Sequence, residues 1–325
     1  MSSVVHQIAR PHGSPTGAEF ALVTGPTPTP TPGTALVENL YLSVDPYMRQ
    51  VMDDGDLHAP MEGRALGRIV ASLDPALPVG GLVFHRHGWR THALVTPADS
   101  RPLPDLPGVP LSAHLGVLGG TGLSAYVGLV RIAQLRPGET VFISAAAGAV
   151  GSAAGQLARL LGASRVIGST GSAAKARHLT DALGFDAALD YRAGDLTGQL
   201  AKAAPDGIDV YLDNVGGDHL EAAIASLREH GRIAWCGAVA QYSSLEPPAA
   251  PRNLFEVMAK SLRLEGFLVR EHLDARPALE ELLVPHIQSG RVSVDETVVD
   301  GIDNMVSAFL GMLRGENLGK MIVRL

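Results

Sequence analysis

The segment AAAGAVG at residues 145–151 restricts the fold of this chain more than any other feature. It follows a predicted strand, TVFISA at 140–145, and precedes a segment with helical spacing at 150–162. A glycine-rich turn between a strand and a helix is typical of the first βα unit of a dinucleotide-binding domain. A packing turn in an Ala-rich chain is the alternative, and the strand–turn–helix context favours the dinucleotide site.

Within this turn, each small residue has a physical role in binding a pyrophosphate. Aligned to G-x-G-x-x-G, Ala146 takes the first glycine position, and Gly148 and Gly151 follow. Gly148 would let the backbone approach the pyrophosphate, and Gly151 would let helix and strand pack closely. The free N–H groups at the helix N-terminus would face the anion. They belong to Ala149, Val150, Gly151 and Ser152.

The second predicted strand, RVIGS at 165–169, decides between NAD and NADP. An NAD enzyme usually places an acidic residue about 20 residues after the turn, where it binds ribose hydroxyls and repels a 2′-phosphate. The segment at 166–177 contains no Asp or Glu. It carries instead three hydroxyls and two cations, on Ser169, Thr170, Ser172, Lys175 and Arg177. This pattern favours NADP, although a solvated helix face would also explain the two cations.

Strand–helix alternation continues to about residue 290 and predicts a parallel, doubly wound sheet of the Rossmann type. A helix is expected near 173–184 and another at 276–290. Further strands are expected at 187–191, 208–214, 232–237 and 263–269.

The two ends of the chain have a different pattern, which predicts a mainly β domain. Short β-type runs lie at 35–44, 65–72 and 81–87, after a proline-punctuated extended segment at 24–33. The tail adds a strand near 294–299, a helix near 303–314 and a strand near 320–324. We expect the tail to return to the first domain, which gives an α/β fold with one domain at 1–118 and 291–325 and an NADP-binding domain at 119–290.

Cysteine usage and charge exclude several classes of protein. Cys236 is the only cysteine, so the chain forms no internal disulfide and no Cys-rich zinc site. The net charge of −7 disfavours a nucleic-acid partner. No apolar run reaches the roughly 20 residues of a membrane helix, and the N-terminus lacks the apolar stretch of a signal peptide. We therefore expect a cytoplasmic protein without a membrane partner.

The sequence gives little support for other kinds of catalytic site. His85, His87 and His92 could in principle form a thiolate-free metal site, but histidines used for packing or at the surface are the more common case, and we expect no metal. No G-x-S-x-G elbow is present, which disfavours an α/β-hydrolase.

A set of motifs in a fixed order then identifies a family. The motifs are SVDPYMR (43–49), GTGLSAY (120–126), AAAGAVGS (145–152), LGFDAALDY (183–191), DNVGG (213–217), GRIAWCGAVAQY (231–242) and GMLRGENLGK (311–320). The chain resembles the zinc-free medium-chain dehydrogenases/reductases, in the branch of prostaglandin reductases, leukotriene dehydrogenases, alkenal double-bond reductases and curcumin-type reductases. The resemblance covers nearly the whole chain, and the first 30 residues match least. The chain departs from the family pattern at GTGLSAY and at 52–60, so the substrate preference is left open.

The resemblance implies a GroES-like catalytic domain split between the two ends of the chain, and a dimer. It also implies that NADPH is held by residues beyond the glycine-rich turn. These are Lys175, Tyr191, Asn214, Cys236, Gly237, Tyr242, Gly266, Phe267, Leu268 and Asn317.

The activity that follows is reduction of an activated C=C bond by NADPH. A hydride would pass to the β-carbon of a small hydrophobic α,β-unsaturated ketone or aldehyde, and negative charge would develop on the carbonyl oxygen. Tyr242 and Tyr47 are the candidate catalytic residues, because a tyrosine hydroxyl stays protonated at neutral pH and can donate to this oxygen. A packing role is the alternative for each. An NADPH quinone oxidoreductase and a non-catalytic NADPH-binding sensor remain alternatives for the whole protein.

Overall fold

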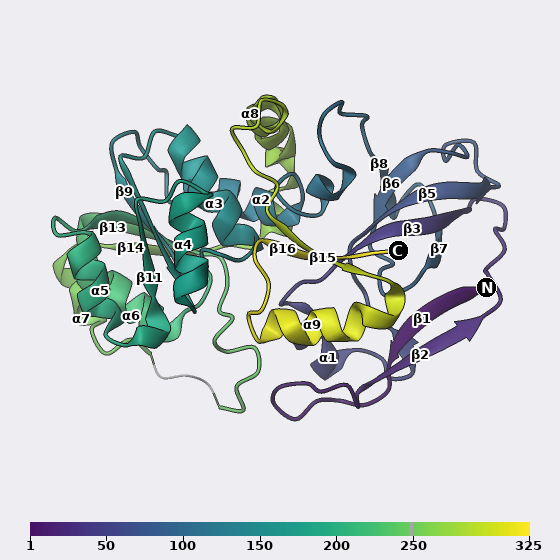
Figure 1. Cartoon of the computed structure of the whole chain (residues 1–325), viewed down its shortest axis with the longest axis horizontal. Helices are drawn as coiled ribbons and strands as arrows, with labels where there is room; N and C mark the ends of the chain where they lie inside the picture. Colours follow the sequence, from purple (N-terminus) through teal and green to yellow (C-terminus); the bar gives the residue numbers. More distant parts are fainter. Residues whose placement is uncertain (247–249) are drawn as a thin grey trace. The chain divides into compact units, whose positions relative to one another are not determined.

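The computed structural model describes residues 1–246 and 250–325. The chain divides into two compact units, which Figure 1 shows coloured along the sequence. Unit 1 consists of Met1–Leu115 and Glu296–Leu325, and unit 2 consists of Gly116–Asp295. Unit 2 is therefore one continuous stretch of chain, whereas unit 1 is assembled from both ends.

Unit 2 contains a six-stranded sheet in the order β11-β10-β9-β12-β13-β14, and all neighbouring strands are parallel. This confirms the expected doubly wound sheet. The carboxyl ends of its strands meet at one edge, where ligands of such sheets bind. The strands are β9 (Thr140–Ile143), β10 (Arg165–Thr170), β11 (Ala187–Asp190), β12 (Ile208–Asp213), β13 (Leu227–Trp235) and β14 (Arg263–Gly266).

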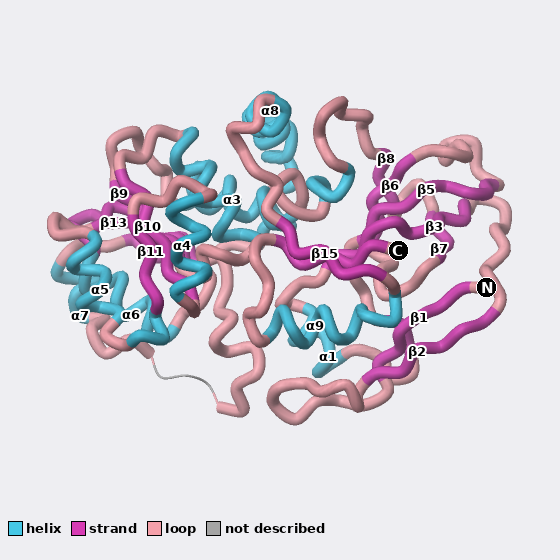
Figure 2. Tube along the Cα trace, viewed as in Figure 1, coloured by secondary structure: helices cyan, strands magenta, loops and turns pink. Residues whose placement is uncertain are grey.

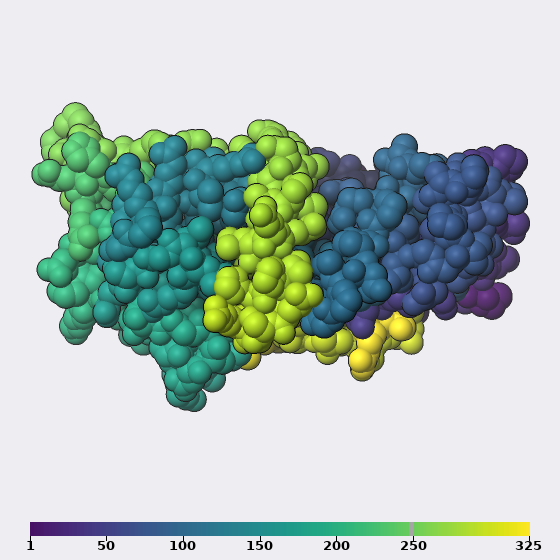
Figure 3. Space-filling view, turned by 90° about the horizontal axis from the view of Figure 1, so that it is seen from above, coloured from purple at the N-terminus to yellow at the C-terminus, as the bar shows by residue number. Residues whose placement is uncertain are grey.

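Helices cover both faces of this sheet (Figure 1). They are α2 (Gly120–Tyr126), α3 (Ala149–Leu160), α4 (Ala173–Asp181), α5 (Leu196–Ala203), α6 (Gly217–Ser226), α7 (Phe255–Ala259) and α8 (Arg276–Gln288). On one face, α5 and α6 pack against Phe142 and Tyr211, whose rings stack at a centroid distance of 5.0 Å. On the other face, α2 continues into a π-helix, Val127–Ile132, next to Leu212. The outer side of α8 lies at the surface (yellow-green in Figure 3).

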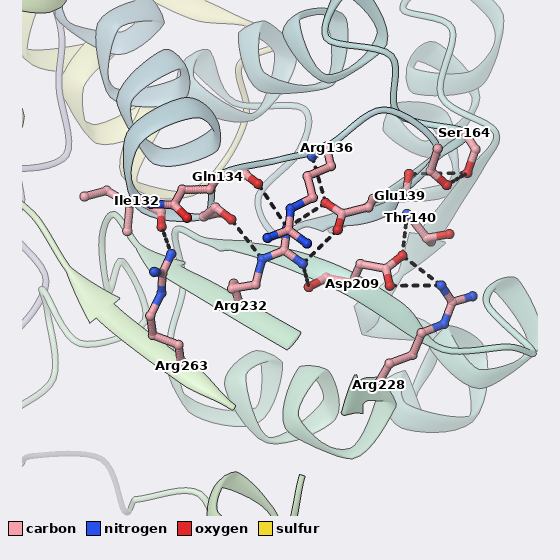
Figure 4. Close-up of polar contacts among 12 residues, drawn as sticks. Ile132, Gln134, Arg136, Glu139, Thr140, Ser164, Asp209, Arg228, Arg232 and Arg263 are labelled. Atoms are coloured by element: carbon pink, nitrogen blue, oxygen red, sulfur yellow. Dashed lines mark hydrogen bonds and ion pairs between the residues drawn. The ribbon is translucent and has the colours of Figure 1, made fainter. Parts of the chain in front are cut away.

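The amino-terminal edge of the sheet is held by ion pairs (Figure 4). The Arg232 guanidinium donates to both carboxylate oxygens of Glu139, at 2.9 and 2.6 Å. The Arg228 guanidinium donates to both oxygens of Asp209, and Asp209 in turn accepts from the Thr140 backbone N–H at 2.8 Å. These charged residues stabilise the edge opposite to the expected site.

Unit 1 consists mainly of strands and loops (Figure 2), as expected for this part of the chain. Its larger sheet has the order β15-β16-β3-β5-β6-β8, with β7 paired to β3, and a small sheet has the order β2-β1-β4. The strands are β1 (Ser2–Gln7), β2 (Phe20–Gly25), β3 (Ala35–Ser43), β4 (Ala59–Pro60), β5 (Ala65–Ser72), β6 (Leu82–His85), β7 (His92–Val95), β8 (Ser100–Pro102), β15 (Glu296–Asp300) and β16 (Lys320–Arg324).

The core of unit 1 joins segments that are far apart in the sequence. The Trp89 ring stacks on Phe20 at 5.6 Å and meets Phe309 edge-on at 5.5 Å. Phe309 belongs to α9 (Met305–Leu313), and Met48 and Met52 of α1 (Met48–Asp54) lie in the same core. The tail therefore packs into the N-terminal part of the chain.

Some boundaries differ from the expectation. β14 ends at Gly266 and not at 269, and α4 ends at Asp181 and not at 184. No helix among residues 1–246 and 250–325 is long and apolar enough to cross a membrane.

Candidate functional site

The turn between β9 and α3 leaves the helix N-terminus open. The N-cap residue of α3 is Gly148, and no side chain caps the helix. A Cβ atom on Gly151 would lie 2.4 Å from the Ala145 carbonyl oxygen and 2.5 Å from the Ala146 Cα, so only glycine fits there. The first N–H groups of a helix have no partner inside the helix. The turn therefore fits a pyrophosphate, which would accept from the N–H groups of Ala149, Val150 and Gly151.

The backbone of this turn differs in one detail from the G-x-G-x-x-G alignment. Ala145, and not Ala146, has the left-handed conformation that favours glycine, with φ of 47°. Ala146 is fully buried, and its Cβ would lie only 2.6 Å from a Cβ atom on Gly168. The methyl group at 146 thus packs against β10, which lacks a side chain at that point.

Residues after β10 and β11 meet at the carboxyl edge of the sheet. The strands pair as parallel neighbours up to Thr170 and Asp190. The Lys175 backbone N–H donates to the Ser172 hydroxyl at 3.3 Å, which caps α4. Tyr191 is 40% exposed, and its ring meets the His219 ring edge-on at 5.1 Å.

The hydroxyls that the sequence offered for a 2′-phosphate are either buried in a strand or used to cap a helix. Ser169 and Thr170 are buried within β10, and Ser172 caps the helix. Of the two cations, Lys175 is partly buried and Arg177 is exposed. Arg192, which the sequence analysis did not consider, also lies at this corner, and its charge contributes to lowering the pKa of Lys175, after burial.

A buried carboxyl organises the loop after β12. Asp213 Oδ1 accepts from the Tyr211 hydroxyl at 2.7 Å and from the N–H groups of Val215 and Gly216 at 2.9 and 2.8 Å. Burial raises the pKa of Asp213. Asn214 is fixed by Ser144, because its side-chain amide donates to the Ser144 carbonyl at 2.8 Å and its N–H donates to the Ser144 hydroxyl at 2.9 Å.

The loop after β13 is also held by Asp213, through its backbone carbonyl. The N–H groups of Cys236 and Gly237 donate to the Asp213 carbonyl oxygen at 2.8 and 3.1 Å. Burial raises the pKa of the Cys236 thiol to about 12, so this cysteine is not a thiolate at neutral pH. The Tyr242 hydroxyl accepts from the Ala238 N–H at 3.4 Å, and burial raises its pKa. Tyr242 therefore keeps its proton and can donate it in a hydrogen bond.

The sixth strand ends beside this loop. The Phe267 N–H donates to the Trp235 carbonyl at 3.4 Å, directly after Gly266. The ring of Phe267 lies close to the backbone of Gly128, where a Cβ atom would be 3.2 Å away. Leu268 is 49% exposed. All of the expected cofactor residues of unit 2 therefore follow the carboxyl ends of strands, along one edge of the sheet.

Tyr47 and Asn317 belong to unit 1. The Tyr47 hydroxyl points to Glu62 Oε1 at 3.5 Å, and the Arg64 guanidinium lies over its ring at 5.1 Å. Burial raises the pKa of Tyr47, so its hydroxyl is a donor at neutral pH. Asn317 is buried, and its side-chain amide donates to the Gly319 carbonyl at 2.7 Å.

A buried ion pair connects two of the sequence motifs. Asp45 of SVDPYMR accepts from the Lys320 ammonium of NLGK at 3.0 Å and from Arg64 at 3.1 Å. Asp45 and Lys320 are each 2% exposed. The pair lies two residues from Tyr47, and so it fixes the segment that carries this tyrosine.

The histidines considered for a metal are engaged in other contacts. His85 is fully buried and bonds Asn39 Oδ1 through Nε2 at 2.9 Å, and burial lowers its pKa to about 3. His87 pairs with Asp99 at 2.9 Å, and His92 bonds the Thr91 hydroxyl at 3.1 Å. In the part of the chain that the structure describes, no group of three or more His, Cys, Asp or Glu side chains could hold a metal ion.

Comparison with known proteins finds relatives along nearly the whole chain. Residues 5–103 match a family described as the N-terminal domain of oxidoreductase, and residues 149–284 match one described as zinc-binding dehydrogenase. The NADPH-dependent curcumin reductase of Escherichia coli (strain K12) is 38% identical, over 97% of this chain and 94% of its own. Prostaglandin reductase 1 of Mus musculus is 42% identical over 96% and 95%. The NADP(+)-dependent 2-alkenal reductase of Nicotiana tabacum is 39% identical over 89% and 86%.

Solved structures agree with these relatives. The crystal structure of CurA from Vibrio vulnificus in complex with NADPH has a TM-score of 0.91 at 35% identity, and the match covers 99% of this chain and 98% of that one. The quinone oxidoreductase of Escherichia coli has a TM-score of 0.78 at 21% identity over 99% and 100%, which shows a shared fold.

Proposed function

The chain belongs to the medium-chain dehydrogenase/reductase family, in the branch of the curcumin, prostaglandin and 2-alkenal reductases, and from this premise we propose that it is an NADPH-dependent reductase of the C=C bond of α,β-unsaturated ketones and aldehydes. The observation that carries the proposal is the near full-length match to three reductases of different unsaturated substrates. The open N-terminus of α3 supports it, because the turn fits the pyrophosphate of the cofactor.

NADPH, when bound, supplies the hydride that adds to the β-carbon of the substrate. The protein then has to stabilise the negative charge on the carbonyl oxygen. We assign this role to Tyr242, whose protonated and half-buried hydroxyl follows the fifth strand of the sheet. Tyr47 is the second candidate donor, and Arg64 and Glu62 fix its ring and hydroxyl.

The first experiment measures consumption of NADPH with 2-alkenals, enones, curcuminoids and quinones, together with analysis of the products. We expect loss of the C=C bond with the carbonyl group retained. Fast turnover of quinones without reduction of any enone would identify a quinone oxidoreductase instead. Binding of NADPH without turnover of any acceptor would point to the sensor.

The second experiment tests the role of Tyr242. Tyr242→Phe should lower kcat by on the order of 10- to 1000-fold, because it removes one donor to the developing oxyanion. Tyr41→Phe is the matched control, since this half-buried tyrosine packs against the core of unit 1 on β3. Unchanged turnover in Tyr242→Phe would remove this residue from the mechanism.

Three further parts of the proposal rest on the resemblance alone or on composition. Unit 1 is the catalytic domain and unit 2 is the NADP-binding domain, two chains form a homodimer, and the protein is cytoplasmic. Size-exclusion chromatography with light scattering tests the dimer.

A further inference from the structure

The corner between β10 and β11 places the Arg192 guanidinium and the Tyr191 phenol beside one glycine. β10 is followed by Gly171, and β11 is followed by Tyr191 and Arg192. A Cβ atom on Gly171 would lie 3.0 Å from the Tyr191 hydroxyl and 3.2 Å from Arg192 Nε. Glycine at 171 therefore lets the phenol and the guanidinium approach the backbone at the carboxyl end of β10. This is the end at which a doubly wound sheet binds the adenosine ribose.

The position of Arg192 is fixed from two sides. Its backbone N–H donates to Asp190 Oδ1 at 3.0 Å, which starts a 3-10 turn at Tyr191. Its guanidinium lies over the Tyr191 ring at 5.8 Å, and that ring is supported by His219. The carboxylate of Asp190 is thus used on the backbone of the loop, and the side chain of Arg192 is held beside Gly171.

The second cation comes from the neighbouring helix. Lys175 lies in the first turn of α4, and it is partly buried. Burial lowers the pKa of Lys175, and the positive charge of Arg192 lowers it further. Two like charges that act on each other in this way are stabilised when an anion lies between them.

We propose that Arg192 is a second cation, together with Lys175, of the subsite that binds the 2′-phosphate of NADPH. This inference rests on the proposed function. A phosphate monoester carries a charge of about −1.5 to −2 at pH 7, which two cations match better than one. The planar guanidinium suits two phosphate oxygens at once, whereas Lys175 acts as a point charge. Arg192 is therefore a specificity residue that favours NADPH over NADH. The missing acid after β10 only removes a charge that would repel the 2′-phosphate, whereas Arg192 binds it.

The test measures ligand binding by calorimetry and needs no turnover. The probes are 2′,5′-ADP, which has the 2′-phosphate, and 5′-AMP, which lacks it. Arg192→Leu should weaken 2′,5′-ADP about 10- to 150-fold, the value of one charge-assisted contact, and change 5′-AMP less than about threefold. Arg192→Lys should recover part of the loss. Arg136→Leu is the matched control, since it removes the same charge from an exposed position at the opposite, amino-terminal edge of the sheet.

Each outcome decides the question. Equal losses for both probes in Arg192→Leu, or no loss for either, would overturn the inference. An equal loss in Arg136→Leu would also overturn it, because the effect would then be that of net charge. If the wild-type protein binds neither 2′,5′-ADP nor NADPH, the proposed function itself fails. Arg192 is exposed, so the variant should fold, and its melting temperature checks this.

Discussion

At the scale of single residues, the tightest constraint in the candidate site is Gly151. Gly151→Ala should destabilise the protein by about 1–3 kcal/mol and weaken NADPH binding, because the new methyl group meets two backbone atoms at 2.4 and 2.5 Å. Gly148→Ala is the control for stability only, since the nearest atom to its Cβ is at 3.2 Å and its φ is −90°, while Gly148 itself belongs to the turn that would bind the pyrophosphate. Thermal unfolding measures the loss of stability in both variants, and titration with NADPH measures the loss of affinity in Gly151→Ala. Equal destabilisation by the two variants would contradict this explanation.

The sequence predicted the glycine-rich turn because its spacing is local. It could not predict which hydroxyls remain available, since Ser169 and Thr170 are buried only once β10 lies between two other strands. Arg192 was missed for a similar reason. Its distance from Gly171 follows from the pairing of β10 with β11, and those two residues are far apart in the sequence.

At the scale of elements, Asp213 connects the loops after β12 and β13. Asp213→Asn keeps the acceptor Oδ1, so the affinity for NADPH should stay within about threefold of wild type and the free energy of unfolding should be no lower than that of wild type. Asp213→Leu leaves the N–H groups of Val215 and Gly216 without this partner, at a cost of about 1–3 kcal/mol each. Chemical unfolding and NADPH titration of both variants measure the difference. If Asn and Leu are equally harmful, the hydrogen bonds are not what holds the loops.

The raised pKa of the Asp213 carboxyl predicts in which direction stability changes with pH. Because burial raises the pKa of Asp213, the folded state holds this proton more tightly than the unfolded state. Stability conferred by the protonated form is present below the unfolded pKa of about 3.9 and is lost as pH rises through the folded value. Asp213→Asn should therefore gain in stability relative to wild type as pH rises above about 4. A difference that is constant with pH would show that folding does not shift the pKa of this carboxyl.

Most strands and helices followed from the sequence, and the exceptions have physical reasons. Alternating and apolar runs predicted β9 to β12 to within two residues, whereas β13 begins at Leu227, five residues before its predicted start. α2 and the π-helix after it carry no regular polar side, because both are buried, so no period marks them. The predicted end of β14 was wrong since Phe267 and Leu268 are apolar but lie beyond the last residue paired with β13.

At the scale of the whole molecule, the Asp45–Lys320 pair links two segments that are 275 residues apart. Lys320→Met should destabilise the protein by roughly 3 kcal/mol, because it breaks a buried pair and leaves Asp45 with Arg64 as its remaining cation. Arg324→Gln is the control, since its pair with Asp300 is exposed and screened by solvent, so its loss should change stability much less. Thermal unfolding compares the two. A smaller effect for Lys320→Met than for Arg324→Gln would contradict the assignment.

The Asp45–Lys320 pair also determines part of the loss of stability at acidic pH. Burial raises the pKa of Asp45, but Lys320 and Arg64 outweigh it and bring the value to about 2. A depressed carboxyl pKa contributes stability that is complete above the unfolded value of about 3.9 and is lost as pH falls towards 2. Asp45→Asn should remove this part of the acid transition. An unchanged transition between pH 4 and 2 would show that other carboxyls account for it.

The place of β16 in its sheet has a consequence for how the protein is made. This strand lies between β15 and β3 and so completes the interior of the sheet. All of unit 2 is synthesised before it, so the Rossmann sheet can form while this edge of β3 is still unpaired. A nascent chain therefore carries an unsatisfied strand edge until β16 has been synthesised, a state in which chaperones or early ligand binding would matter most.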